Sequence, residues 1–174
     1  MDINKLKLVK PTLELETAFL EMLAEFKSFN ERPRPGIIRI ETDYQTLITK
    51  LNNYSLGIRI EEKYVPNSTY VLLDHNTIIG TVNIRHYLNE YLFKYDGHIG
   101  GAIRPRQRNN GYGTIMLCLA LDKARELDIE KALVTCNKGN LASEKIIIKN
   151  GGIFDSEEIE GNGNIVRRFW INLK

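Results

Sequence analysis

Residues 108–113 read Arg-Asn-Asn-Gly-Tyr-Gly, and apolar helix formers dominate residues 115–121 directly after them. A strand-like stretch, residues 97–104, comes before them, so the order is strand, glycine-rich turn, helix N-terminus. The first turn of a helix carries backbone N–H groups without intrahelical partners, and the helix dipole adds partial positive charge there. Gly111 and Gly113 have no Cβ atom to hold an anion away from these donors. The segment therefore predicts a phosphate-binding loop.

The spacing of the glycines restricts the kind of phosphate ligand. No Lys follows Gly113, so this is not the Gly-x-x-x-x-Gly-Lys-Ser/Thr loop of nucleoside triphosphatases. The next glycine after Gly113 is Gly139, which excludes the Gly-x-Gly-x-x-Gly fingerprint of dinucleotide-binding proteins. Arg104 and Arg106 add positive charge nearby. They either attract the phosphates of the ligand or belong to a solvated loop.

A second motif follows farther along the chain. Residues 131–136 have the pattern of a buried strand, and Asn140-Leu-Ala-Ser143 then opens another helix. The Arg/Gln-x-x-Gly-x-Gly/Ala loop and this Asn-x-x-Ala/Ser motif together resemble the GNAT superfamily of N-acetyltransferases. Residues 65–154 look like a bacterial branch of predicted acetyltransferases. The first 60 residues do not identify the family by themselves, and we expect substrate specificity to lie there.

The resemblance implies acetyl-coenzyme A as the co-substrate and no metal. In this superfamily the loop holds the diphosphate, the second motif contacts the pantetheine and phosphate region, and the pantetheine arm enters between two splayed central strands. Gly100 and Gly101 fit either a closely approaching ligand or a β-bulge in the first of these strands. The residues expected to bind the coenzyme are Ala102, Ile103, Arg108, Asn109, Asn110, Gly111, Gly113, Thr114, Asn140 and Ser143.

The reaction implied by the resemblance is transfer of the acetyl group to a primary amine by direct attack in a ternary complex. An alkyl ammonium of pKa about 10.4 is roughly one part in a thousand neutral near pH 7.4, so a base is useful. His98 is the candidate catalytic base, because the resemblance places its strand against the thioester and imidazole titrates near neutral pH. A lone strand histidine is otherwise a hydrogen-bonded structural residue. His86 is a weaker candidate, and Asp96, Glu61 and Glu62 either assist the proton or the acceptor, or are solvated.

One position departs from the family pattern. Many members have a Tyr seven residues after the motif Asn, where its hydroxyl protonates the leaving thiolate, and this sequence has Ile147 there. The departure leaves open a non-catalytic acyl-coenzyme A-binding sensor or interaction module. A nucleotide-binding protein using the same loop fits less well, because neither an acidic metal motif nor a phosphate-binding Lys accompanies the loop.

The acceptor is not identified by the sequence. Polyamines, aminoglycoside-like compounds, free amino acids and protein amino termini all fit, so the expected partner is a small-molecule or peptide amine. By family analogy, residues 36–40 and the loop before them border the acceptor groove. A homodimer is left open, because many relatives form dimers.

Composition agrees with one α/β domain spanning residues 1–174. The chain has 43% apolar residues and a net charge of +2, so neither nucleic acid nor an acidic membrane is indicated as a partner. The first residues lack the apolar stretch of a signal peptide, and we expect a cytoplasmic protein. Cys118 and Cys136 are expected in the core, and the three histidines show no metal-ligand spacing.

The elements that position the motifs follow from periodicity and turn residues. An opening strand is expected at residues 6–9, a helix from 11 to 26, a loop over 28–36, and a second helix from a Thr42-x-x-Gln45 capping box to Gly57. Strands 69–73 and 77–85 form a hairpin, and strands 153–159 and 165–173 form another across Gly-Asn-Gly-Asn. The expected fold is a GNAT-like mixed sheet, splayed at its centre and flanked by helices.

Overall fold

The computed structural model describes residues 5–38 and 43–174. Within them, seven strands form one sheet in the order β1-β2-β3-β4-β5-β7-β6. The strands are β1 Leu6–Val9, β2 Asn67–Asp74, β3 Thr77–Arg85, β4 Ile99–Ile103, β5 Lys131–Asn137, β6 Ile153–Ile159 and β7 Ile165–Asn172. Neighbouring strands are antiparallel except β4 and β5, which are parallel. The expected mixed sheet and both expected hairpins are confirmed.

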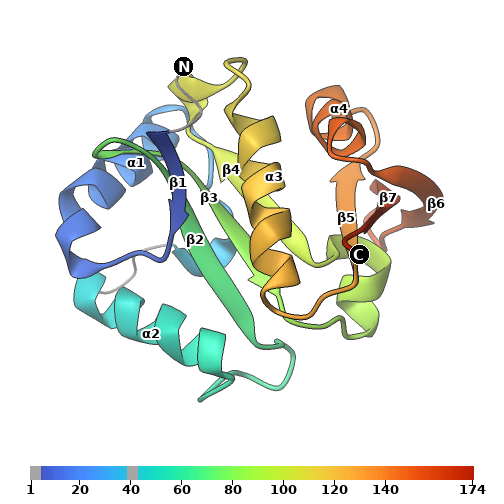
Figure 1. Cartoon of the computed structure of the whole chain (residues 1–174), viewed down its shortest axis with the longest axis horizontal. Coiled ribbons are helices and arrows are strands. Elements are labelled where there is room, and N and C mark those ends of the chain that lie inside the picture. The colour runs from blue at the N-terminus through green and yellow to red at the C-terminus, as the bar shows by residue number, and fades with distance from the viewer. Residues whose placement is uncertain (1–4, 39–42) are drawn as a thin grey trace.

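In the described part of the chain, four α-helices cover the sheet. They are α1 Glu16–Ser28, α2 Tyr44–Leu56, α3 Tyr112–Arg125 and α4 Leu141–Lys149. The first two pack on one face of the sheet, and α3 and α4 pack on the other (Figure 1). The segment between β3 and β4 contains a π-helical turn, Leu92–Asp96.

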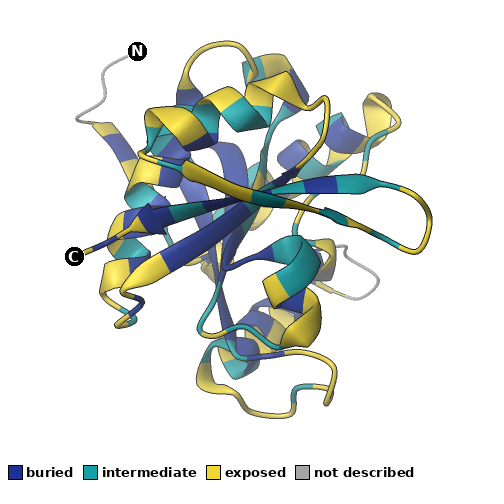
Figure 2. Cartoon of the chain, turned by 90° about the vertical axis from the view of Figure 1, so that its right-hand side faces the viewer, coloured by how far each residue is buried: buried dark blue, intermediate teal, exposed yellow. Residues whose placement is uncertain are grey.

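Alternation along the strands divides the core into two layers. Val71 and Ile78 face α1 and α2, where Phe19 and Phe26 are fully buried. Leu72 faces α3 instead, within the larger cluster. The central strands are accordingly buried, while the helices keep exposed outer faces (Figure 2).

Two helix starts differ from the sequence expectation. The chain forms a short 3₁₀ turn, Leu13–Leu15, before α1 begins at Glu16. The N-cap of α2 is Asp43, whose carboxylate accepts hydrogen bonds from the Thr46 amide at 2.9 Å and from its hydroxyl at 2.7 Å. The expected capping residue, Thr42, lies outside the described residues. A carboxylate next in sequence fills the cap position as well as a hydroxyl would.

The two cysteines differ in burial. Cys136 on β5 is buried, as expected, and burial raises the pKa of its thiol. Cys118 is exposed, because Leu117 and Leu121 take the inward face of α3. Among the helices of residues 5–38 and 43–174, none combines the length and apolar character that a bilayer span requires.

Candidate functional site

The strands β4 and β5 separate along most of their length. Their ladder contains one residue pair, Ile99 and Val134, although both strands continue beyond it. Just before this pair, the His98 amide donates a hydrogen bond to the Leu133 carbonyl at 2.7 Å. In the described part of the chain, no further residue pair joins these strands. The expected splay of two neighbouring central strands is confirmed.

The alternation of the β3–β4 ladder decides which backbone groups face the splay. The amide of Arg104, directly after β4, donates to a carbonyl of β3, so even-numbered residues of β4 are bonded to β3. Gly101 and Ile103 therefore turn their N–H and C=O groups toward β5. Ala102, which the sequence analysis also named, directs its backbone toward β3. Gly101 was expected either beside a closely approaching ligand or in a bulge, but it was not included among the residues expected to bind the coenzyme.

Glycine occupies positions 100 and 101 of β4 for different structural reasons. The β3–β4 register runs without interruption, so the alternative of a bulge is wrong. A Cβ atom at Gly101 would lie 2.5 Å from the Thr81 carbonyl oxygen and 3.1 Å from the terminal methyl carbon of Met116, so β3 and α3 both require glycine there. A Cβ at Gly100 would lie 3.0 Å from the nearest guanidinium nitrogen of Arg85. Glycine at position 100 thus allows the Arg85 guanidinium to lie close above β4.

The loop between β4 and α3 presents a row of free backbone donors. Asn109 and Gly111 have positive φ angles of 63° and 81°. Among the described residues, no acceptor bonds the five consecutive amides from 109 to 113. Alternating left-handed residues before a helix N-terminus form an anion-binding concavity, so this arrangement fits a diphosphate. The Thr114 amide donates to the Gly111 carbonyl at 3.1 Å. The threonine hydroxyl has no hydrogen-bond partner among the described residues and can therefore contact a ligand.

Gly113 serves helix packing as well. A Cβ there would lie 2.6 Å from the terminal methyl carbon of Ile146, so glycine allows α4 to approach the start of α3. The side chain of Asn110 donates to the Gln107 carbonyl at 3.4 Å, within the loop itself.

The arginines near the loop are paired with glutamates from the α1 region. Arg108 forms a bidentate pair with Glu31, at 2.8 Å and 2.5 Å, and its Nε donates to the Ile103 carbonyl at 3.1 Å. Arg104 Nε lies 2.6 Å from Glu25, in a pair that is mostly buried. The Arg106 amide donates to the other oxygen of Glu25 at 2.9 Å. Arg104 is therefore a structural link between α1 and the loop and not a solvated loop residue.

The second motif caps α4. The side-chain oxygen of Asn140 accepts a hydrogen bond from the Ser143 amide at 3.1 Å, which is an N-cap interaction. Asn140 is exposed at the same edge of the sheet as the donor-rich loop, because α3 and α4 both begin after the carboxyl ends of the parallel strands β4 and β5. Both expected coenzyme-binding segments are therefore brought to one end of the splay.

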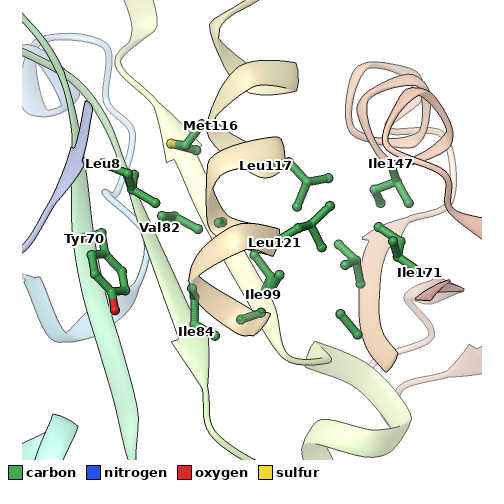
Figure 3. Close-up of a cluster of buried hydrophobic side chains, with 14 of the residues drawn as sticks. Leu8, Tyr70, Val82, Ile84, Ile99, Met116, Leu117, Leu121, Ile147 and Ile171 are labelled. Carbon is green, nitrogen blue, oxygen red and sulfur yellow. The ribbon is translucent and has the colours of Figure 1, made fainter. Parts of the chain in front are cut away.

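Ile147 belongs to the core. Its side chain is 2% exposed and points from α4 toward Leu117 of α3, with Ile171 of β7 beside it (Figure 3). Gly152 leaves room for it, since a Cβ there would lie 2.4 Å from an Ile147 methyl carbon. Position 147, where the resemblance led us to expect the tyrosine of many family members, is thus part of the packing between α3 and α4.

The candidate base, His98, lies buried where β4 and β5 part. Its Nδ1 accepts a hydrogen bond from the Leu133 amide at 2.9 Å. Burial, with a smaller effect from the Arg85 guanidinium, lowers the pKa of His98 from 6.5 to about 4. His86 has its Nε2 atom 2.9 Å from the Ser68 hydroxyl, and burial also lowers its pKa. Each imidazole therefore has a polar partner and a pKa below the ordinary value for histidine.

A cavity of about 700 Å³ opens on the α2 side of the sheet. Its floor is formed by β2 and β3 through Asn67, Asn83 and Arg85, and the turn before β4 adds Asp96. The rest of the wall comes from Pro35, Gly36, Lys50, Tyr54, Glu61, Lys63, Tyr64, Val65, Tyr91 and Leu92. Pro35 and Gly36 lie in the expected groove segment, of which residues 39–40 are outside the described residues. His98 and Glu62 do not line the cavity.

Within residues 5–38 and 43–174, no group of three or more His, Cys, Asp or Glu side chains is arranged to hold a metal ion.

Solved structures of low sequence identity share this fold. A Salmonella typhimurium acetyltransferase that modifies the N-terminal serine of ribosomal protein L7/L12 aligns with a TM-score of 0.67 at 15% identity, covering 98% of this chain and 96% of that one. YncA, a putative acetyltransferase from Salmonella typhimurium solved with acetyl-coenzyme A, aligns at 0.63 and 12%, covering 98% and 95%. A chimera of the Vibrio cholerae spermidine N-acetyltransferase aligns at 0.64 and 15%, covering 97% and 96%.

Sequence comparison supplies the family. A search of curated proteins returned no match. Residues 6–153 match the family described as the acetyltransferase (GNAT) domain, and this match contains the splayed strands, the donor-rich loop and the Asn140 cap. The chain therefore belongs to the GNAT family of acetyltransferases.

Proposed function

We propose that this protein transfers the acetyl group of acetyl-coenzyme A to a primary amine by direct attack in a ternary complex. The observation that carries the proposal is the splay of β4 and β5, whose open end meets the donor-rich loop. The α2-side cavity lies beside β3 and the turn that precedes β4. Acetyl-coenzyme A supplies a thioester, which an amine attacks without a covalent enzyme intermediate. The amine nitrogen forms a bond to the acetyl carbon, the carbon–sulfur bond breaks, and the amine loses a proton.

The chain offers a separate site for each part of the coenzyme. The amides of residues 109–113 suit the diphosphate, as argued above. The backbone groups of Gly101 and Ile103 suit the amide-containing pantetheine arm, because an extended ligand adds to a strand edge through main-chain hydrogen bonds. Arg108 and Asn140 lie at the loop end of this path, and we propose that both contact the phosphate region.

The hydrogen bonding of His98 argues against its expected role as the base. His98 uses its only available nitrogen lone pair for the Leu133 amide, so we propose that it holds the strands and does not take the proton. Glu61 and Asp96 are the carboxylates that line the cavity, and each is already paired, with Lys63 at 2.8 Å and with Arg85 at 3.3 Å. Alignment of the amine and thioester then supplies most of the acceleration.

The proposal is tested by binding and turnover on the same protein. Calorimetric titration with acetyl-coenzyme A should show binding, with ATP and NAD as controls, and a panel of amines should then release free thiol and give acetylated product. Binding of the coenzyme without acetylation of any amine would support a non-catalytic sensor instead. Absence of coenzyme binding would contradict both functions.

A further inference from the structure

A directed chain of hydrogen bonds runs along the floor of the cavity. The amide nitrogen of Asn67 donates to the Val65 carbonyl at 2.9 Å, so the Asn67 oxygen must point the other way, where it accepts from Asn83 Nδ2 at 2.6 Å. The same Asn83 nitrogen donates to the Thr69 hydroxyl at 3.0 Å. A backbone carbonyl cannot donate, and it therefore fixes the polarity of the whole chain.

The chain leaves one acceptor free. Both protons of Asn83 Nδ2 are used by Asn67 and Thr69, and Asn83 Oδ1 has no partner among the described residues. Asn83 lines the cavity although its side chain is almost fully buried. It lies directly opposite Gly100 in the β3–β4 register, one strand from the splay. A carbonyl oxygen held here is suited to accept an N–H bond from an amine beside the thioester.

Arg85 lies two residues after Asn83 on the same face of β3, and its guanidinium supplies a hydrogen-bond donor that complements the Asn83 oxygen. Its guanidinium bonds the Asp96 carboxylate at 3.3 Å and the carbonyls of Asp96 and Gly97 at 3.3 Å and 3.4 Å, all of them long. Its Nε and one Nη2 proton have no partner within the described part of the chain. Residues two apart on a strand lie about 7 Å apart, which suits a ligand whose amine and carbonyl are separated by one carbon.

The charges of the cavity oppose a polycationic acceptor. Of the described residues, Lys63 pairs with Glu61 and Arg85 with Asp96 in its wall, and Lys50 adds one further positive charge, so the wall carries a net charge of +1 (three cations, two carboxylates). A ligand with several ammonium groups would meet like charge there.

Because His98 has no free lone pair to take a proton, an acceptor whose amine is only weakly basic is favoured. An α-amine has a pKa of about 7.7–8.0 against about 10.4 for an alkyl amine, so near pH 7.4 its neutral fraction is roughly a few hundred-fold larger. An α-amine can therefore react where no nearby imidazole has a free lone pair, as holds for His98.

We infer that the acceptor is an α-amino carbonyl compound, with its amine held by Asn83 Oδ1 and its carbonyl by the Arg85 guanidinium. The inference rests on the proposed acetyltransferase function. Asn83 and Arg85 are specificity-determining residues, and Asn67 and Thr69 are positioning residues that orient Asn83. A peptide amino terminus and an amino acid amide share this chemistry, whereas the carboxylate of a free amino acid keeps its α-amine more strongly protonated.

The test compares acceptors on the intact protein. With acetyl-coenzyme A, we expect kcat/KM for alaninamide and trialanine to exceed that for n-propylamine, Nα-acetyl-lysinamide and spermidine by at least about tenfold at pH 7.4. Free alanine is the contrasting acceptor, because a free carboxylate lies where a peptide would continue. Preference for any of the three alkyl amines would overturn the inference and leave acetyl transfer standing. If none of the compounds is acetylated although calorimetry shows coenzyme binding, both the inference and the proposed catalysis fail.

Two variants test the residues themselves. Asn83→Leu should raise KM for alaninamide at least about tenfold while leaving the Kd for acetyl-coenzyme A unchanged, and Asn52→Leu on the exposed face of α2 is the matched control. Arg85→Lys keeps the charge but loses the planar fork, and should reduce the preference for alaninamide over n-propylamine. An unchanged KM and an unchanged preference in folded variants would contradict the assignment.

Discussion

The Leu133 amide donates a hydrogen bond of 2.9 Å to His98 Nδ1, and the Leu133 carbonyl accepts one of 2.7 Å from the His98 amide. This reciprocal pair joins β4 to β5 where the strands begin to part. Because Nδ1 is the acceptor, the neutral ring carries its proton on Nε2 and has no second lone pair for a substrate proton. This geometry supports the proposal that His98 holds the two strands together at the base of the splay.

His98→Asn should preserve activity. The side-chain oxygen of asparagine can accept from the Leu133 amide in place of Nδ1, while the variant has no titratable ring. We expect kcat and its pH profile to stay within about threefold of the parent, measured by thiol release. His98→Leu is the contrasting variant: it leaves the buried amide unpaired and should cost about 1–3 kcal/mol in the free energy of unfolding. A collapse of kcat in a folded asparagine variant would restore His98 as the base.

The same histidine predicts a pH dependence of stability. Its pKa falls from 6.5 to about 4 on folding, because burial disfavours the charged ring. Between these values the unfolded chain binds more protons, so the stabilisation is fully present above pH 6.5 and is lost as the pH falls toward 4. We expect the free energy of unfolding, measured by urea denaturation, to fall by about 2 kcal/mol more in the parent than in His98→Asn between pH 7 and pH 5. Equal slopes in the two proteins would show that the ring is not so strongly buried.

Gly111→Val should weaken coenzyme binding. Gly111 has φ of 81° at the start of α3, and a branched side chain there both strains the backbone and covers the free amides. We expect the Kd for acetyl-coenzyme A to rise at least about tenfold in calorimetry. Gly163→Val is the matched control, because Gly163 has φ of 83° in the β6–β7 turn and its added Cβ would meet no atom within 4 Å. Equal affinity losses in both variants would point to general backbone strain instead of a loop contact.

Glu31→Gln should strengthen coenzyme binding. Glu31 holds Arg108 in a bidentate pair beside the loop, so its carboxylate both occupies the guanidinium and repels phosphate. Removing the charge should lower the Kd for acetyl-coenzyme A severalfold at low salt, with a smaller gain at higher ionic strength. Glu90→Gln, which breaks a surface pair with Lys94, serves as the control and should leave the Kd unchanged. A higher Kd in Glu31→Gln would show that Glu31 orients Arg108 for its ligand.

Local sequence patterns predicted most of the fold. Strand β1 and strand β6 have the expected bounds, and turn-forming residues at 74–76 and 161–164 predicted the two hairpins, because turn chemistry and strand alternation act within a few residues. The loop at 108–113 was likewise visible, since its glycines and the following helix are adjacent in sequence. Cys118 was misjudged because a single apolar run does not show which face of a helix is turned outward.

Contacts between distant residues were not predictable in this way. The Leu133–His98 bond, the pairing of Glu31 with Arg108 and the Asn67–Asn83 chain each join segments whose separation in sequence hides their proximity. Their geometry depends on how the strands are ordered in the sheet. The expectation for His98 was therefore based on its residue type and on the strand that the family resemblance places against the thioester, and the cavity floor was not anticipated.

Ile147→Tyr should not supply the acid that other family members carry. Ile147 is 2% exposed and packs against Leu117, so a tyrosine ring would overfill the core and its hydroxyl would lack a partner. We expect the free energy of unfolding to fall by about 1–3 kcal/mol, with no increase in kcat. Ile148→Tyr is the matched control, because Ile148 is 53% exposed on the same helix and should tolerate the ring. A rise in kcat for Ile147→Tyr alone would mean that the new hydroxyl reaches the thiolate, and that α4 can rotate its inward face toward the splay.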